Sequence, residues 1–133
     1  MYRYNEIAES GALLTFSSDV VTSYELHRSD PLFGIQVAAT RIDPEYPLSP
    51  SVYPGSARPE TDARLSRELL SAGYTINGAK QLRLADKIGS LEVGKVANLC
   101  VLSADPFEVE PRALGEIEFD AVIFEGRVVA GSL

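Results

Sequence analysis

Two short apolar runs near the C-terminus constrain the fold more than any other feature of the sequence. Residues 119–124 (FDAVIF) and 127–129 (RVV) are rich in branched and aromatic side chains, and only Glu125 and Gly126 separate them. A two-residue connection that contains glycine is typical of a tight β-hairpin. A third run of this kind precedes them in the chain. The sequence therefore predicts strands over residues 97–102, 119–124 and 127–129, with a turn or short helix over 111–115.

The first part of the chain carries helix signals instead. Asp30 is suited to cap a helix, and Pro31 fits the first helical position, so a helix is predicted over residues 31–41. Residues 42–60 contain five prolines and form an irregular segment, either a functional loop, such as a lid that includes Arg41, or a disordered one. Further helices are predicted over residues 4–10 with Gly11 as the stop, 65–70 with Ser66 as the cap, and 74–84 after a break or kink at Gly73.

A carboxylate follows the N-terminal apolar segment. Residues 12–16 (ALLTF) are typical of a short buried strand, and Asp19 comes soon after it, with no lysine or arginine close by in sequence. Burying a carboxylate is costly unless it is paired or binds a metal. From spacing alone, a turn or cap role is favoured for Asp19, because Ser-Asp after a strand is a common loop entry.

Composition narrows the classes of function. A net charge of −7 argues against binding to nucleic acid or to an anionic membrane surface, and no apolar run approaches the roughly 20 residues of a membrane span. The polar N-terminus is unlike a signal peptide, and a single cysteine suits the cytoplasm. One histidine and one cysteine are too few for a conventional zinc site or a Ser-His-Asp triad.

Three segments resemble a known family. Residues 88–102 (IGSLEVGKVANLCVL) and 121–129 (AVIFEGRVV) are similar to the C-terminal signature of metal-dependent amidohydrolases, a GSLEVGKLADLVVLD segment followed by a GRVV ending. Residues 72–79 (AGYTINGA) resemble the AYTINGA segment of the family-3 branch, which includes N-substituted formamide deformylase-like and YtcJ-like proteins. The 30–41 segment and the Ser18-Asp19 pair fit the same branch.

The resemblance implies an α/β fold and a C-terminal fragment. Residues 1–85 would be the last β/α portion of a (β/α)8 barrel, with residues 12–16 as the eighth strand, followed by a loop and the final helices. Residues 86–133 would be the C-terminal strands of a small β-sandwich-like domain. Unpaired strand edges and apolar surface would then favour a homo-oligomer or an N-terminal partner chain.

The resemblance also assigns a role to Asp19. In this superfamily an aspartate at the end of strand eight binds the catalytic divalent metal, with zinc the expected ion, and acts as general base on the metal-bound water. The complete enzyme would hydrolyse a non-peptide C–N bond of a small amide, formamide or cyclic amide. The family's histidine and lysine ligands have no counterpart here, and a catalytic site needs about three protein ligands. The 133-residue chain is therefore expected to bind no stoichiometric zinc and to be inactive alone.

Other interpretations remain open at this point. The alternative function is a non-catalytic binding or assembly module derived from such an enzyme. For His27, a solvated loop position is favoured over a substrate contact, and Cys100 is expected to be a small core residue within its apolar run.

Overall fold

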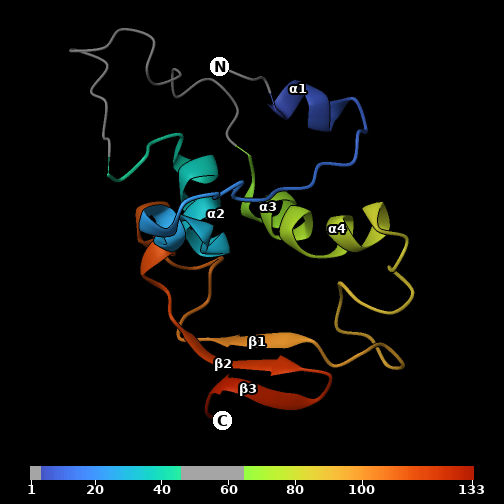
Figure 1. Cartoon of the computed structure of the whole chain (residues 1–133). Helices are drawn as coiled ribbons and strands as arrows, with labels where there is room; N and C mark the ends of the chain where they lie inside the picture. The colour runs from blue at the N-terminus through green and yellow to red at the C-terminus, as the bar shows by residue number, and fades with distance from the viewer. Residues whose placement is uncertain (1–3, 46–64) are drawn as a thin grey trace, which may run out of the picture.

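The computed structural model describes residues 4–45 and 65–133, which form a helical part and a separate antiparallel sheet (Figure 1). Most of the proline-rich segment lies outside the described residues. The helices are α1 (Tyr4–Glu9), the 3₁₀ helix η1 (Ser23–Ser29), α2 (Pro31–Thr40), α3 (Arg67–Tyr74), α4 (Ile76–Gln81) and the 3₁₀ helix η2 (Pro111–Glu116). The strands are β1 (Leu99–Leu102), β2 (Phe119–Phe124) and β3 (Arg127–Gly131). No helix among these residues is long and apolar enough to cross a membrane.

The predicted helix caps are confirmed. The Asp30 carboxylate accepts a hydrogen bond of 2.8 Å from the backbone N–H of Leu32, and the Ser66 hydroxyl accepts one of 3.2 Å from that of Leu69. Each bond satisfies a backbone donor that has no partner within its helix. Gly73, in contrast, does not end α3, which continues to Tyr74, so the break predicted at this glycine is wrong by one or two residues.

The sheet confirms the predicted hairpin. The strand order is β1-β2-β3 with both pairs antiparallel, and Glu125 and Gly126 connect β2 to β3 with φ angles of 49° and 77°. Positive φ at both turn positions matches the twist of the flanking strands. The Asn98 side chain accepts a hydrogen bond of 2.8 Å from the Glu125 N–H, so residues just before β1 hold the turn.

The main core lies among the helices. It joins α2, α3 and η2 through a cluster of buried side chains: Leu32, Ile35, Ala39, Leu65, Leu70, Leu114 and Ile117. Gln36 is also buried, and its Oε1 accepts a hydrogen bond of 2.7 Å from the Gly115 N–H, which ties α2 to η2. The cluster thus contains residues from both sides of the domain boundary expected near residue 85, and that boundary stays a prediction.

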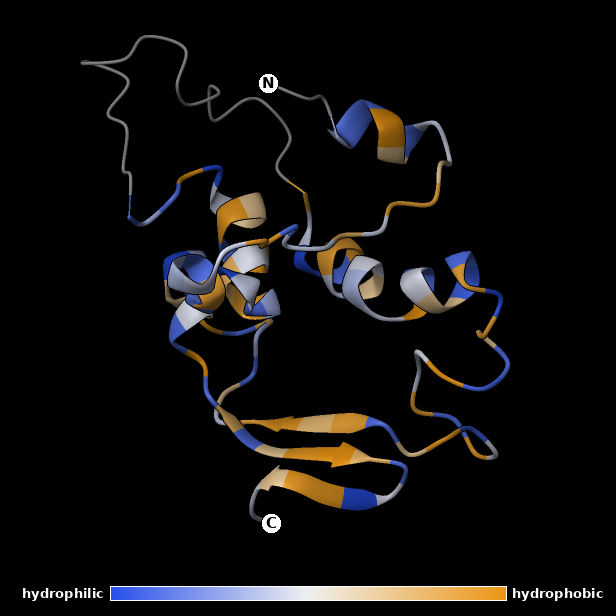
Figure 2. Cartoon of the chain, viewed as in Figure 1, coloured by the Kyte–Doolittle hydropathy of each residue, from blue (hydrophilic) through white to orange (hydrophobic). Residues whose placement is uncertain are grey.

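Two expectations from the sequence differ from the structure. Residues 12–16 form no strand and are not fully buried, since Leu13 is 50% exposed. A strand in a parallel barrel needs a hydrogen-bonded neighbour on each side, and no described residue pairs with this segment. The mixture of helix and sheet is observed, whereas the barrel portion is not. Cys100 is exposed in the edge strand β1, so the expected core position is wrong; Figure 2 shows apolar residues along all three strands.

Candidate functional site

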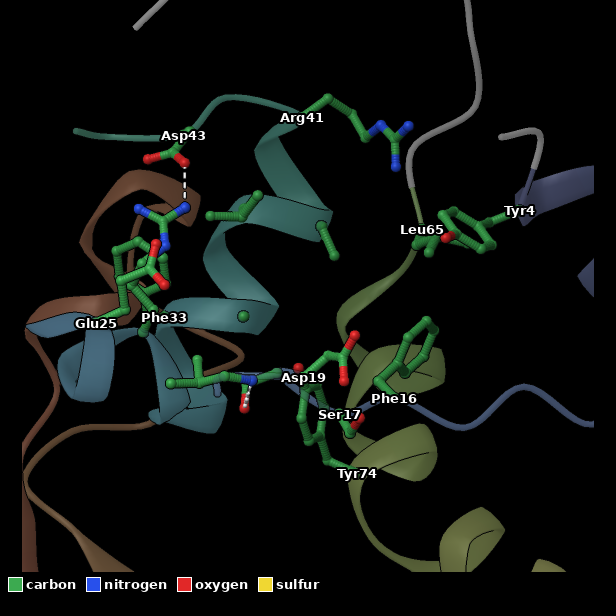
Figure 3. Close-up of a pocket in the computed structure, with 16 residues that line it drawn as sticks. Tyr4, Phe16, Ser17, Asp19, Glu25, Phe33, Arg41, Asp43, Leu65 and Tyr74 are labelled. Atoms are coloured by element: carbon green, nitrogen blue, oxygen red, sulfur yellow. Dashed lines mark hydrogen bonds and ion pairs between the residues drawn. The ribbon is translucent and has the colours of Figure 1, made fainter. Parts of the chain in front are cut away.

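A pocket of about 790 Å³ lies among residues 16–20, η1, α2 and α3 (Figure 3). Its wall combines aromatic rings with charged side chains of both signs. The aromatic residues are Tyr4, Phe16, Phe33 and Tyr74, and the charged residues are Asp19, Glu25, Arg28, Arg41 and Asp43. The pocket therefore brings Asp19 next to groups from four other segments of the chain.

Asp19 is exposed, and its carboxylate is free of partners among the described residues. Its φ angle of 52° places it in the left-handed region, which aspartate tolerates better than most residues. No hydrogen bond or ion pair to its side chain is found within the described part of the chain, and the carboxylate points into the pocket in Figure 3. It caps no helix, since Thr22 precedes η1 and Asp30 caps α2. Of the turn or cap role that spacing alone favoured, the structure thus does not support the cap, whereas the left-handed φ angle is compatible with a turn.

Aromatic packing holds the segment that precedes Asp19. The rings of Phe16 and Tyr74 are stacked, with centroids 5.8 Å apart and planes inclined by 28°. The Tyr4 ring meets Phe16 edge-on at 6.5 Å. Burial raises the pKa of Tyr74, because the phenolate is less well solvated in this environment than in water.

A backbone contact fixes the same segment from the other side. Asn77 lies in α4, and its Nδ2 donates a hydrogen bond of 3.0 Å to the carbonyl oxygen of Leu14. Asn77 belongs to the AGYTINGA stretch, so this stretch has a structural role: it positions the chain that leads to Asp19. The contact between these two segments was not predicted from the sequence.

The two arginines of the pocket differ in their partners. Arg28 donates hydrogen bonds to Asp43 and Glu45 and lies over the Phe33 ring, 5.0 Å from its centroid. The hydrogen bond with Asp43 is the main reason why the pKa of Arg28 is raised. Arg41 lies over the ring of Tyr4, 5.8 Å from its centroid, and has no carboxylate partner among residues 4–45 and 65–133.

His27 does not line the pocket. Its Nε2 lies 2.7 Å from Oε1 of Glu45, and its side chain is 53% exposed. The ring also meets Phe33 edge-on at 6.1 Å. This position agrees with the surface interpretation and gives no support to a substrate contact.

The described residues do not fit a metal ion on their own. Nowhere in ranges 4–45 and 65–133 do three or more His, Cys, Asp or Glu side chains gather at distances suited to a metal. The other acidic groups of the pocket are engaged, since Glu25 accepts a hydrogen bond of 2.5 Å from Thr22 and Asp43 accepts one from Arg28. Asp19 alone offers too few ligands for a catalytic metal site.

Of the pocket's functional candidates, only Asp19 was predicted from the sequence. Arg41 was expected only as part of a possible lid, and no role was predicted for Tyr4 or Tyr74. The aromatic residues carry no local signal of a binding site. For Arg41, its place directly after a capped helix was the available signal.

Comparison with known proteins finds one matching family model and several similar proteins that share one name. A family model described as the amidohydrolase family matches residues 1–130. The chain is 40% identical over 52 residues to an imidazolonepropionase of Bacteroides thetaiotaomicron, covering 39% of the chain and 12% of that protein. It is 36% identical over 83 residues to an imidazolonepropionase of Bacteroides fragilis (62% and 20%) and 33% identical over 72 residues to one of Bdellovibrio bacteriovorus (54% and 17%).

The matched region is a small part of these relatives. The alignments span no more than 20% of the length of any of these three imidazolonepropionases. No solved structure matches the chain.

Proposed function

Because this chain belongs to the amidohydrolase family, we propose that it is the C-terminal part of a hydrolase of non-peptide C–N bonds and that Asp19 supplies one carboxylate to the active site. The observation that carries this proposal is the free carboxylate of Asp19, which faces a pocket among other polar groups. The chain by itself is proposed to be inactive, because the described residues bring no further metal ligands to this carboxylate. The protein is proposed to act in the cytoplasm.

In this proposal, residues 12–16 are the eighth strand of a (β/α)8 barrel in the complete protein. Residues 1–85 complete the barrel, and residues 86–133 belong to the small β domain. Support comes from the unpaired segment that ends near Asp19, since catalytic residues of such barrels follow the C-terminal ends of strands. The stack of Phe16 on Tyr74 would hold this strand end in place.

The role proposed for Asp19 is that of metal ligand and general base. A free carboxylate can accept a proton from an attacking water molecule and return it to the leaving nitrogen. A divalent metal, with zinc as the expected ion, would require ligands beyond those that the described residues bring together with Asp19. The relatives' name makes imidazolonepropionate one compound to test, beside formamides and other cyclic amides.

Substitution of Asp19 in the complete protein tests this proposal. Asp19→Asn should lower kcat for a hydrolysed formamide or cyclic amide by about 10²- to 10⁴-fold, the range attributed to a general base. Asparagine tolerates positive φ well, so the variant should fold normally. Asp86 is exposed and lies outside the pocket, so Asp86→Asn is the matched control and should keep full activity. Undiminished turnover by Asp19→Asn would contradict the proposal.

A non-catalytic assembly module is the second candidate, and the exposed sheet favours it. Val128 and Val129 of the edge strand β3 are 45% and 60% exposed. Exposed apolar edge strands tend to pair with another chain, which would be a second copy or an N-terminal partner. The intact mass of the polypeptide in its natural cell distinguishes the candidates. A mass several-fold above 14.4 kDa favours the enzyme, and a species at 14.4 kDa bound to a partner favours the module.

A further inference from the structure

Arg41 directly follows α2 and caps its C-terminal end. Its φ angle is 62°, and its N–H donates a hydrogen bond of 2.8 Å to the carbonyl oxygen of Val37, which closes the helix end. This left-handed turn directs the side chain over the pocket. In Figure 3 Arg41 extends from the end of α2 across one side of the pocket, while Asp19 lies on the opposite side.

The guanidinium of Arg41 has unused hydrogen-bonding capacity. Within residues 4–45 and 65–133, its side chain lies over the Tyr4 ring, with Cζ 5.8 Å from the ring centroid. No hydrogen bond or ion pair to a described residue occupies the five N–H donors of this guanidinium. Arg28 provides the contrast, because Asp43 and Glu45 already occupy its donors. Of the two arginines that line the pocket, Arg41 is the one able to receive an anionic ligand.

Charge in the pocket is therefore distributed unevenly. Asp19 is a free negative group at one side, and Arg41 is a free positive group at the other, and no ion pair joins them in the described structure. An anionic group of a ligand would be repelled near Asp19 and attracted near Arg41. The planar fork of arginine matches two oxygens of a carboxylate, as it does those of a phosphate, so a carboxylate at this side of the pocket could accept two parallel hydrogen bonds.

We propose that Arg41 determines specificity by binding the carboxylate of the substrate, so that the substrate class is a small amide that carries a carboxylate. This inference rests on the proposed function, in which the C–N bond of the same molecule lies near Asp19. The aromatic side chains of Tyr4 and Phe16 would contact the part of the substrate between the two ends. Arg41 touches the substrate but not the reacting atoms.

Binding of a matched pair of probes to the complete protein tests the inference. N-acetylglycine carries a carboxylate, and N-acetylglycinamide has nearly the same shape without the charge. We expect calorimetry to show about 10- to 100-fold tighter binding of N-acetylglycine, the range expected of a hydrogen-bonded charged group. Arg41→Gln should abolish this preference, and Arg41→Lys should retain part of it.

The control is Arg83→Gln. Arg83 also has a positive φ angle, 57°, but it is exposed and does not line the pocket, so its replacement should leave the preference unchanged. A urea unfolding curve for each variant shows whether the fold is retained. Equal binding of the two probes by the wild-type protein, or an unchanged preference in folded Arg41→Gln, would overturn the inference.

Failure of the proposed function would look different. If the complete protein prefers N-acetylglycine through Arg41 but hydrolyses no amide, the site binds carboxylates and the proposed hydrolysis is wrong. If amides are hydrolysed with an Asp19-dependent rate but Arg41→Gln changes neither the probe preference nor KM, the hydrolase stands and the role of Arg41 is wrong.

Discussion

The ring of Phe16 stacks on that of Tyr74, and a glycine lies close to each of these two side chains. A Cβ atom at Gly73 would overlap the Phe16 ring, and a Cβ atom at Gly34 would overlap the Tyr74 hydroxyl. The pair therefore joins the segment before Asp19 to α3 and to α2 at once. These four residues hold one wall of the pocket in place. Replacing any of them should therefore move the segment that carries Asp19.

Two glycines in consecutive helices should respond oppositely to alanine. Gly73→Ala should destabilise the protein by about 1–3 kcal/mol, because the new methyl group displaces the buried side of Phe16. Gly78→Ala should stabilise it by about 0.5–1 kcal/mol, because nothing lies within 4 Å of the added Cβ and alanine favours the helix. Urea unfolding of both variants measures the difference. A stabilising Gly73→Ala would show that Phe16 does not pack against this helix in solution.

The free energy of unfolding should fall as the pH rises in the alkaline range, because Tyr74 is partly buried. Burial raises its pKa in the folded state above the usual value of about 10. As pH rises past this value, the unfolded chain loses the phenolic proton first, so the unfolded state gains stability and the free energy of unfolding falls. Tyr74→Phe should remove this part of the decline. Unfolding free energies between about pH 9 and 11 provide the measurement, and identical slopes for the two proteins would contradict the expected burial.

Gln36 should be required for the contact between α2 and η2. Gln36→Met keeps the approximate shape but leaves the Gly115 N–H without its acceptor, which should lower stability by about 1–3 kcal/mol. Amide exchange at Gly115 should become faster at the same time. Gln81 is exposed at the end of α4, so Gln81→Met is the control and should change stability by no more than about 0.5 kcal/mol. Unchanged exchange at Gly115 in Gln36→Met would show that another group protects this amide.

Asn98 should stabilise the hairpin through its side-chain oxygen. Asn98→Ala removes the acceptor of the Glu125 N–H and should cost about 0.5–1 kcal/mol, a small effect because the site is exposed. Asn98→Asp keeps an oxygen in the same place and should be close to neutral. Amide exchange at Glu125 by NMR separates the two variants. Equal protection of this amide in both would mean that the hydrogen bond is absent in solution.

Much of the secondary structure could be predicted because its signals are local. Asp30 and Ser66 cap helices through bonds to residues two or three positions away. The hairpin at Glu125-Gly126 follows from the conformational freedom of its turn. The 3₁₀ helix η1 contains His27, for which a loop position was expected. The segment 12–16 was expected to be a strand, and its apolar residues indeed favour one, but a strand exists only where a second segment pairs with it.

The features of the candidate site can also be separated into those visible in the sequence and those that depend on the tertiary structure. The sequence by itself determined the family signature, the presence of Asp19 after an apolar segment, and the shortage of metal ligands. Only the tertiary structure decided that Arg41 faces the same pocket as Asp19, that Phe16 packs on Tyr74, and that Asn77 holds the chain before the carboxylate. The physical reason is that caps and turns depend on neighbours in the chain, whereas a pocket depends on side-chain packing and charge between segments that meet only after folding.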